Sequence, residues 1–157
     1  MSVVQRDYIE RMIEQCAQAI GEIVALVRAG DFDLALIMVR KTSDLVVGNL
    51  GPVLERLDAA SVVELVGKYD LDRIRMYAAL LAEEGTIREL RGQAARAEYC
   101  FGRTLELYAA ISLSGARLKT ADWERIVSLQ PRVAVGAIDS RYQDELLRLA
   151  SQNAPRV

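Results

Sequence analysis

Side chains that could carry out chemistry are scarce in this chain of 157 residues. It contains no histidine and only two cysteines, alongside 22 acidic and 20 basic residues. Without histidine the chain lacks the commonest general base, the nucleophile–histidine pairs and the Glu-x-x-His ligands of di-iron bundles. Two thiols do not complete a structural zinc site, and no Gly-x-x-x-x-Gly-Lys-Ser/Thr loop is present to hold nucleotide phosphates. We therefore predict no enzymatic activity, no cofactor and no bound metal.

Two pairs of acidic residues have a spacing that a metal site or an acid–base catalyst could use. They are Glu10 with Glu14, and Glu83 with Glu84. Glu10 and Glu14 lie opposite the apolar stripe of a predicted helix, where a solvated surface carries charge in any case. We interpret these carboxylates as surface residues, and a metal or acid–base role is the alternative.

The two cysteines, Cys16 and Cys100, fall within apolar helical patterns far apart in the sequence. This placement is typical of reduced, buried thiols that pack as small hydrophobic side chains. A disulfide or a reactive thiol is the alternative.

Arginines gather near the middle of the chain, at positions 73, 75, 88, 91, 96 and 103. Arg88 and Arg91 lie near a predicted helix C-terminus, where a positive charge complements the helix dipole. We interpret the group as a solvated, salt-bridged surface, and a site for an acidic partner or RNA is the alternative. The net charge of -2 and the aromatic content of 6% disfavour nucleic acid as the partner.

The first half of the chain reads as a helical hairpin over residues 5 to 48. Apolar residues recur every three or four positions from Gln5 to Ala29, which predicts one long helix. Ser2 and Gln5 resemble a capping box at its start, and Gly30 is its predicted stop. Asp31 is placed to cap a second helix, which ends at the glycines around position 48. So short a link predicts that the two helices run antiparallel.

A second hairpin is predicted over residues 70 to 113, with short helices before it. Pro52 to Leu57 predicts one helical turn, and Ser61 begins a capping box for a brief helix that ends near Lys68. Asp70 is placed to cap a long helix that closes at Gly92, and Gln93 opens the next one.

The last forty residues predict two shorter helices. Thr120 is placed to cap one that runs to Leu129, before Pro131 breaks it, and Asp139 caps a terminal helix. Residues 133 to 138 predict either an extended piece or the start of a helix, and residues 152 to 157 predict a frayed end. We predict a single all-α domain over residues 1–157, with hairpins at 5–113 and a C-terminal extension or cap at 114–157.

The two hairpin turns share a pattern that resembles the tetratricopeptide repeat. In each, a glycine ends one helix and an alanine follows five residues later: Gly30 and Ala35, then Gly92 and Ala97. The run from Gly30 to Leu36 resembles the usual turn into the second helix of such a repeat. The opening Asp7-Tyr8-Ile9-Glu10-Arg11-Met12-Ile13-Glu14-Gln15 is similar to the start of an uncharacterised bacterial domain family with tetratricopeptide-like hairpins. These resemblances imply a degenerate, non-catalytic interaction fold.

The chain also departs from a regular tandem array. The two glycines, at positions 30 and 92, are 62 residues apart, whereas tetratricopeptide repeats recur every ~34 residues. The usual aromatic residue in the first helix of each hairpin is also missing. We predict two degenerate repeats separated by short helices, and a bundle that imitates them is the alternative.

These features predict an adaptor or scaffold that binds another protein or its own copy. The first helix carries extra apolar residues beside its main stripe, so that it needs contacts on two sides; either a partner or a C-terminal segment folded back over this helix could supply them. Trp123 is interpreted as a plug at the end of the hairpin stack, with a partner-binding anchor as the alternative. The predicted interface residues are Tyr8, Ala19, Leu26, Arg88, Arg91 and Trp123.

Two other functions remain open at this point. One is a small-ligand sensor or regulatory subunit with a pocket between the hairpins, and the other is an atypical enzyme that uses Glu, Tyr or Cys. A deep apolar cavity would favour the first, and a buried carboxylate beside Tyr77 or Tyr108 would favour the second. The chain has no stretch of roughly 20 apolar residues and no signal peptide, so we predict a cytoplasmic protein without a membrane partner.

Overall fold

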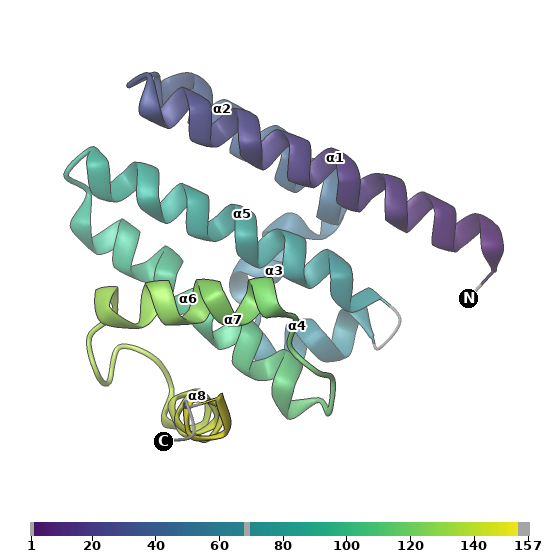
Figure 1. The fold of residues 1–157 in the computed structure, drawn as a ribbon, viewed down its shortest axis with the longest axis vertical. Coiled ribbons are helices and arrows are strands. Elements are labelled where there is room, and N and C mark those ends of the chain that lie inside the picture. Colours follow the sequence, from purple (N-terminus) through teal and green to yellow (C-terminus); the bar gives the residue numbers. More distant parts are fainter. Residues whose placement is uncertain (1, 68–69, 154–157) are drawn as a thin grey trace.

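A computed structural model describes residues 2–67 and 70–153, and within these residues the fold is entirely helical (Figure 1). No strand occurs in the described ranges, so the prediction of an all-α fold is confirmed. The α-helices are α1 (Val3–Arg28), α2 (Phe32–Val47), α3 (Gly51–Arg56), α4 (Ala59–Val66), α5 (Leu71–Leu90), α6 (Ala94–Leu113), α7 (Thr120–Leu129) and α8 (Ser140–Asn153). Two 3₁₀ turns, η1 (Gly48–Leu50) and η3 (Gln130–Arg132), follow α2 and α7.

The first hairpin begins as its sequence predicts. The Ser2 hydroxyl accepts a hydrogen bond from the Gln5 amide at 3.2 Å, and the Gln5 side chain accepts one from the Ser2 amide at 3.1 Å. This reciprocal pair satisfies two backbone donors that the first helical turn leaves free. At the start of α2 the Asp31 carboxylate accepts from the Leu34 amide at 3.4 Å.

The α1–α2 turn and the α5–α6 turn have the same backbone geometry. Gly30 and Gly92 have φ of 78° and 77°, in the left-handed region that favours glycine. In the first turn the Asp31 amide donates to the Leu26 carbonyl at 2.9 Å, and in the second the Gln93 amide donates to the Arg88 carbonyl at 2.8 Å. In both turns the donor lies two residues after the helix cap. Each is a Schellman motif. The sequence alignment of the two turns therefore corresponds to a real structural repeat of the turn.

The alanines that follow these turns lie where helices cross. Ala35 is 0% exposed and Ala97 is 2% exposed. We expect Ala35→Leu and Ala97→Leu each to lower the free energy of unfolding by about 1–3 kcal/mol, because extra methylenes overpack a closely packed contact. Urea unfolding measures this, with Ala95→Leu on the exposed side of α6 as the matched control. Parent-like stability of both buried variants would show that these crossings are loosely packed.

Two predicted helix starts are wrong. Thr120 does not cap α7, because it is the first residue of that helix and Lys119 is the cap. Ser61 lies inside α4, which begins at Ala59, so the expected capping box at Ser61 does not form. The start of α4 is instead held from α8: Tyr142 Oη accepts from the Ala60 amide at 2.9 Å and donates to Asp58 Oδ1 at 2.7 Å. Arg141 also donates to Asp58, at 2.8 Å. A tertiary contact, which local sequence does not reveal, therefore sets this boundary.

The C-terminal segment packs on the second hairpin. Both α7 and α8 contact α6 (Figure 1). The structure therefore differs from the alternative in which this segment folds back over α1, because its main support is α6. Residues 133–139, which predicted an extended piece or a helix start, form irregular turns between η3 and α8. The predicted fraying at the chain end concerns mainly residues 154–157, which lie outside the described residues; Gln152 and Asn153 belong to α8.

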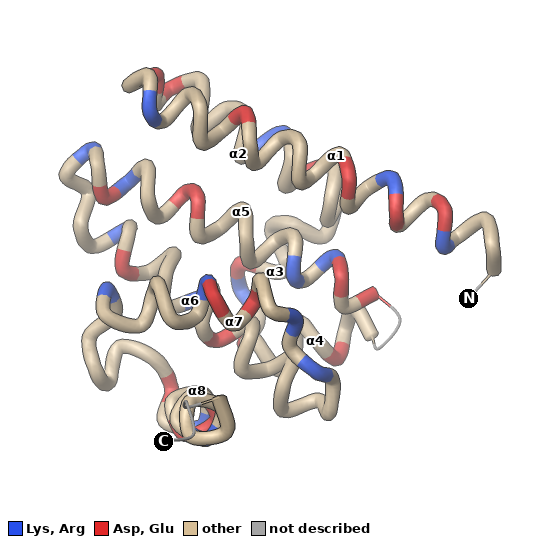
Figure 2. The backbone as a smooth tube through the Cα atoms, in the orientation of Figure 1, with Lys and Arg blue, Asp and Glu red and all other residues tan. Residues whose placement is uncertain are grey.

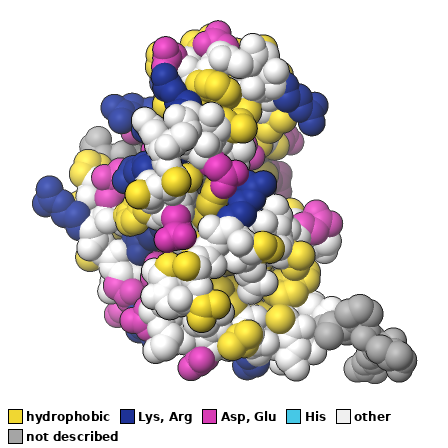
Figure 3. Space-filling model, turned by 90° about the vertical axis from the view of Figure 1, so that its left-hand side faces the viewer, with side chains coloured by type: hydrophobic (Ala, Val, Ile, Leu, Met, Phe, Trp, Pro, Cys, Tyr) yellow, Lys and Arg dark blue, Asp and Glu magenta, His cyan; other side chains and the backbone are white. Residues whose placement is uncertain are grey.

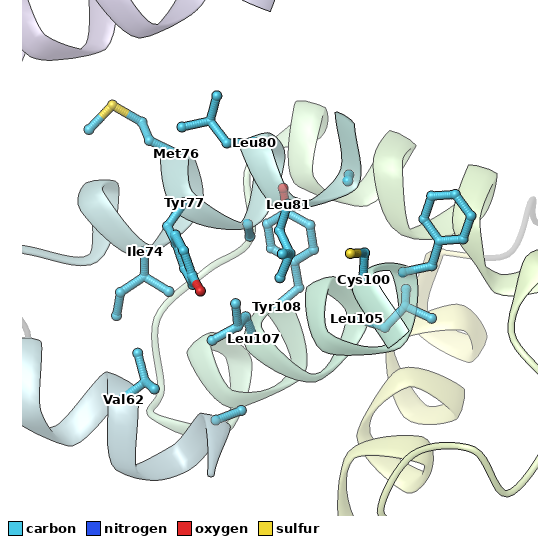
Figure 4. Packing of buried hydrophobic residues seen from close by; sticks show 14 of the residues in the cluster. Val62, Ile74, Met76, Tyr77, Leu80, Leu81, Cys100, Leu105, Leu107 and Tyr108 are labelled. Atoms are coloured by element: carbon cyan, nitrogen blue, oxygen red, sulfur yellow. The ribbon is translucent and has the colours of Figure 1, made fainter. Parts of the chain in front are cut away.

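Helix α5 lies at the centre of the core and is buried on more than one side (Figure 4). Met76 and Leu80 extend from it on one side, whereas Ile74 and Tyr77 extend on the side of Val62 in α4. Because neighbouring helices cover α5 on several sides, its apolar residues do not form a single stripe. The first hairpin packs on one flank of α5 and α6 packs on another.

A glycine allows α5 and α6 to approach closely. A Cβ atom at Gly85 would lie 2.5 Å from Phe101 Cε1 and 3.1 Å from Cys100 Cβ. Both neighbours are buried in α6, so neither has room to move away. The second hairpin is therefore closed by small residues on each of its helices, Gly85 and Ala97.

Both cysteines are reduced and buried, as the apolar pattern predicts. Burial raises the pKa of the Cys16 thiol from 9.0 to about 11 and that of the Cys100 thiol to about 12. The neutral thiols therefore contribute stability that is complete below the unfolded value of 9.0 and is lost as the pH rises through the folded values.

We expect the urea midpoint to fall as the pH is raised from about 8 to about 11, because the unfolded chain releases the thiol protons first. The double variant Cys16→Ala/Cys100→Ala should show a smaller fall over the same range, whatever its stability at neutral pH. Equal pH slopes for parent and variant would contradict this assignment.

Candidate functional site

A groove lies on the described surface between the two hairpins. It has a volume of about 610 Å³ and is lined by α2, α3, α5 and α6. We call it the inter-hairpin groove; its principal residues are Ile37, Arg40, Asp44, Glu55, Tyr77, Leu81, Glu84, Arg88 and Arg96. Four separate helices therefore contribute side chains to one concave surface.

Charges in the groove are balanced rather than of one sign. Glu84 Oε1 lies 3.4 Å from Arg88 Nη2 and 3.5 Å from Arg96 Nη2, so one carboxylate pairs with two guanidinium groups. Arg88 also donates to Gln93 at 3.0 Å, while its buried Nε has no hydrogen-bond partner within the described chain. Together with Arg40, Asp44 and Glu55, the groove has three basic and three acidic side chains. This balance suits a polypeptide of mixed charge better than a polyanion.

Tyr77 brings a polar group to the floor of the groove. It is 8% exposed, and burial raises the pKa of its hydroxyl to about 12, so the group is neutral at ordinary pH. Among the described residues none forms a hydrogen bond with this hydroxyl, and its oxygen is not one of the buried atoms that lack a partner. The hydroxyl is therefore available to a ligand or to water.

The structure does not gather the predicted interface residues into one site. Arg88 lines the inter-hairpin groove, but Arg91 pairs with Asp33 at 2.8 Å and so joins the two hairpin turns. Tyr8 is 55% exposed and borders a different, open cleft of about 580 Å³ under the first turns of α1. Ala19, Leu26 and Trp123 are half-buried, and Leu26 and Trp123 pack against the core.

Most of the groove could not be found from the sequence. Ile37 and Arg40 read as ordinary surface positions of an amphipathic helix, and Glu55 lies in a short helix whose placement no local pattern reveals. Tyr77 reads as a core residue, which it also is. The arginine cluster was the only sequence signal, and it identified Arg88 and Arg96 without the residues that face them.

A buried carboxylate, the feature that would favour an enzyme, lies near one of the two tyrosines, Tyr108. Asp122 is 4% exposed and lies near Tyr108. Its Oδ2 accepts from Arg75 Nε and from the Lys119 amide, both at 2.9 Å, while Tyr108 accepts from Arg125 at 2.9 Å. Asp122 is thus engaged in holding the start of α7 against α5. Across the described residues, no group of three His, Cys, Asp or Glu side chains is placed to hold a metal ion.

Charged residues of both signs are distributed over the helices (Figure 2). On the face that carries the hairpin turns, basic and acidic side chains lie among small groups of hydrophobic ones (Figure 3). No described helix combines the length and apolar character needed to cross a bilayer.

Comparison with protein-family models, curated proteins and solved structures finds no significant match to this chain. The tetratricopeptide-like family relationship therefore stays a prediction that rests on the hairpin turns.

Proposed function

We propose that this protein is a non-catalytic interaction module that binds a segment of a partner protein, or of a second copy, in the inter-hairpin groove. The observation that carries the proposal is the groove itself, which combines a tyrosine floor with balanced charges and which no described part of the chain fills. Aromatic and arginine side chains such as Tyr77, Arg88 and Arg96 are the types enriched where proteins bind one another.

Exposed apolar side chains on the same helices support this proposal. They have exposed fractions between 41% and 51% and belong to α2, η1 and α3: Leu34, Ile37, Leu45, Leu50 and Val53. Single exposed apolar residues are normal, but several on adjoining elements are typical of a contact surface, and of these five Ile37 lines the groove itself. A partner that covers Ile37 would also reach the charged walls of the groove.

Self-association through this surface is the first case to test. We expect light scattering at micromolar concentration to give twice the chain mass of 17.4 kDa for the parent and a single chain mass for Ile37→Glu, because a buried carboxylate without a partner is costly. Leu147→Glu, at an equally exposed position on α8, is the matched control and should remain dimeric. A monomeric parent would exclude self-association.

A different protein partner is tested by site-specific photocrosslinking in cells that express the chain. A crosslinker at position 37 is expected to capture one defined partner, and the same crosslinker at position 147 is expected not to capture it. The product should be lost when Arg88→Glu reverses the charge on the groove wall. A monomeric parent without any product specific to position 37 would contradict the interaction function.

A second candidate function is a small-ligand sensor or regulatory subunit. It is favoured by one observation, a partly open and mainly apolar cavity of about 140 Å³ between α2, α3, α4 and α5. Tyr77 and Val47 line both this cavity and the inter-hairpin groove, so that a ligand in the cavity could alter the groove.

A further inference from the structure

The cavity beside Tyr77 is built mainly from aliphatic side chains. They come from the end of α2 through η1, and from α3, α4 and α5: Val47, Leu50, Leu54, Leu65, Val66 and Ile74. Its volume of about 140 Å³ is close to that of an apolar cavity of roughly 150 Å³ that stays dry and accommodates benzene. The space therefore suits a compact apolar group of about six heavy atoms.

One end of the cavity is polar, and two of its polar atoms have no hydrogen-bond partner. Asp70 and Arg73 line this end, with side chains that are 32% and 29% exposed, and Arg73 Nη1 donates to the Val46 carbonyl at 3.3 Å. Asp70 Oδ1 and Arg73 Nε are themselves buried atoms, and neither has a hydrogen bond within the described residues. Arg73 Nε lies 3.0 Å from Asp70 Oδ2, close enough for an ion pair, but its N–H is not aligned with that oxygen. A buried atom of this kind gains from a hydrogen-bond partner.

These unsatisfied groups define the chemistry of the head group that would complement them. Asp70 Oδ1 needs a donor, and Arg73 Nε needs an acceptor. Because the two side chains neutralise one another, a charged ligand would leave a net charge partly buried, which is costly. A neutral group that both donates and accepts, such as a primary amide, matches this end of the cavity.

We propose that this cavity binds a small neutral molecule with an aromatic or branched aliphatic body and a primary amide head. The body contacts the aliphatic wall, the amide N–H donates to Asp70 Oδ1, and the amide carbonyl accepts from Arg73 Nε. The open cleft under α1 shares Val66, Asp70 and Arg73 with the cavity and gives access from solvent. This inference rests on the second candidate function, and its test does not require that the groove binds a partner.

The probe is benzamide, titrated into the full-length protein and followed by the methyl resonances of the cavity residues. We expect saturable binding at one site, with the largest shifts at Val47, Leu54 and Val66. Toluene, which has the same ring without the amide, is expected to bind at least about tenfold more weakly, the loss of roughly one well-made hydrogen bond. Benzoate, with a charged head of similar shape, is expected not to bind.

A pair of variants separates this cavity from other surfaces. Val66→Phe places a ring at the half-buried rim of the cavity and is expected to abolish benzamide binding. Val127→Phe makes the same change at an exposed position on α7 and should bind as the parent does. Far-UV circular dichroism checks that both variants are folded.

Three results would overturn the proposal. One is the absence of saturable benzamide binding up to about 10 mM, where even a Kd near 1 mM would be close to saturation. Another is equal affinity for benzamide and toluene, because the polar end would then recognise nothing. The third is unchanged binding by folded Val66→Phe. None of these results changes the outcome expected for Ile37→Glu or for crosslinking at position 37, so the two proposals fail separately.

Discussion

Replacing Arg103 with methionine is expected to lower the free energy of unfolding by about 2–4 kcal/mol. Arg103 lies in α6 and is buried, and its Nη2 donates to the carbonyls of Leu54, at 2.7 Å, and of Leu57. These carbonyls belong to the last turn of α3 and the residue after it, where helix geometry supplies no partner. Methionine fills much of the same space but donates nothing, so two carbonyls lose their hydrogen bonds.

Chemical denaturation measures this change, and Arg11→Met is the control. Arg11 is exposed on α1 and forms no ion pair or side-chain hydrogen bond with another described residue, so its replacement should change stability by at most about 0.5 kcal/mol. A similar small effect at Arg103 would mean that water replaces the guanidinium at both carbonyls.

Replacing Arg75 with methionine is expected to cost about 3–5 kcal/mol, because it breaks a buried ion pair from one side only. Arg75 Nε lies 2.9 Å from Asp122 Oδ2, and its Nη2 donates to the Arg117 carbonyl at 2.8 Å. The variant leaves the buried Asp122 carboxylate without its cation. The contact of α7 with α5 should loosen first.

Two further variants test the cause of this loss. Arg132→Met removes an exposed pair with Glu89 at 3.5 Å and should cost at most about 1 kcal/mol, as surface pairs do. The double variant Arg75→Met/Asp122→Asn should regain part of the stability lost in Arg75→Met, because no buried charge is left unpaired while the amide oxygen still accepts from the Lys119 amide. If the double variant is less stable than the single one, the ion pair is not the origin of the loss.

One tyrosine lines both the groove and the cavity in addition to its place in the core. Tyr77 contributes to the core on α5, to the floor of the inter-hairpin groove and to the wall of the cavity. A side chain shared in this way couples the two hollows, because a shift of the ring to accommodate an occupant on one side changes the space on the other. Binding of benzamide and of a groove partner should therefore affect one another if both proposals hold.

Local sequence was enough to predict the elements whose boundaries depend on local chemistry. The capping box at Ser2, the left-handed glycines at positions 30 and 92 and the burial of Ala35 and Ala97 all occur as expected. Each depends on backbone sterics or on a hydrogen bond within a few residues, which neighbouring residues determine whatever the rest of the fold does. The all-helical class follows from the same local signals, repeated along the chain.

Only the tertiary structure determines how these helices pack against one another and which surfaces they form together. The start of α4 depends on Tyr142, a residue 82 positions from Ala60. The packing of α7 and α8 on α6 is likewise a tertiary contact that local sequence does not specify. The inter-hairpin groove draws Ile37, Glu55, Tyr77 and Arg96 from four helices. A periodic pattern does not predict such tertiary contacts, because periodicity indicates which face of a helix is buried and not which neighbour buries it.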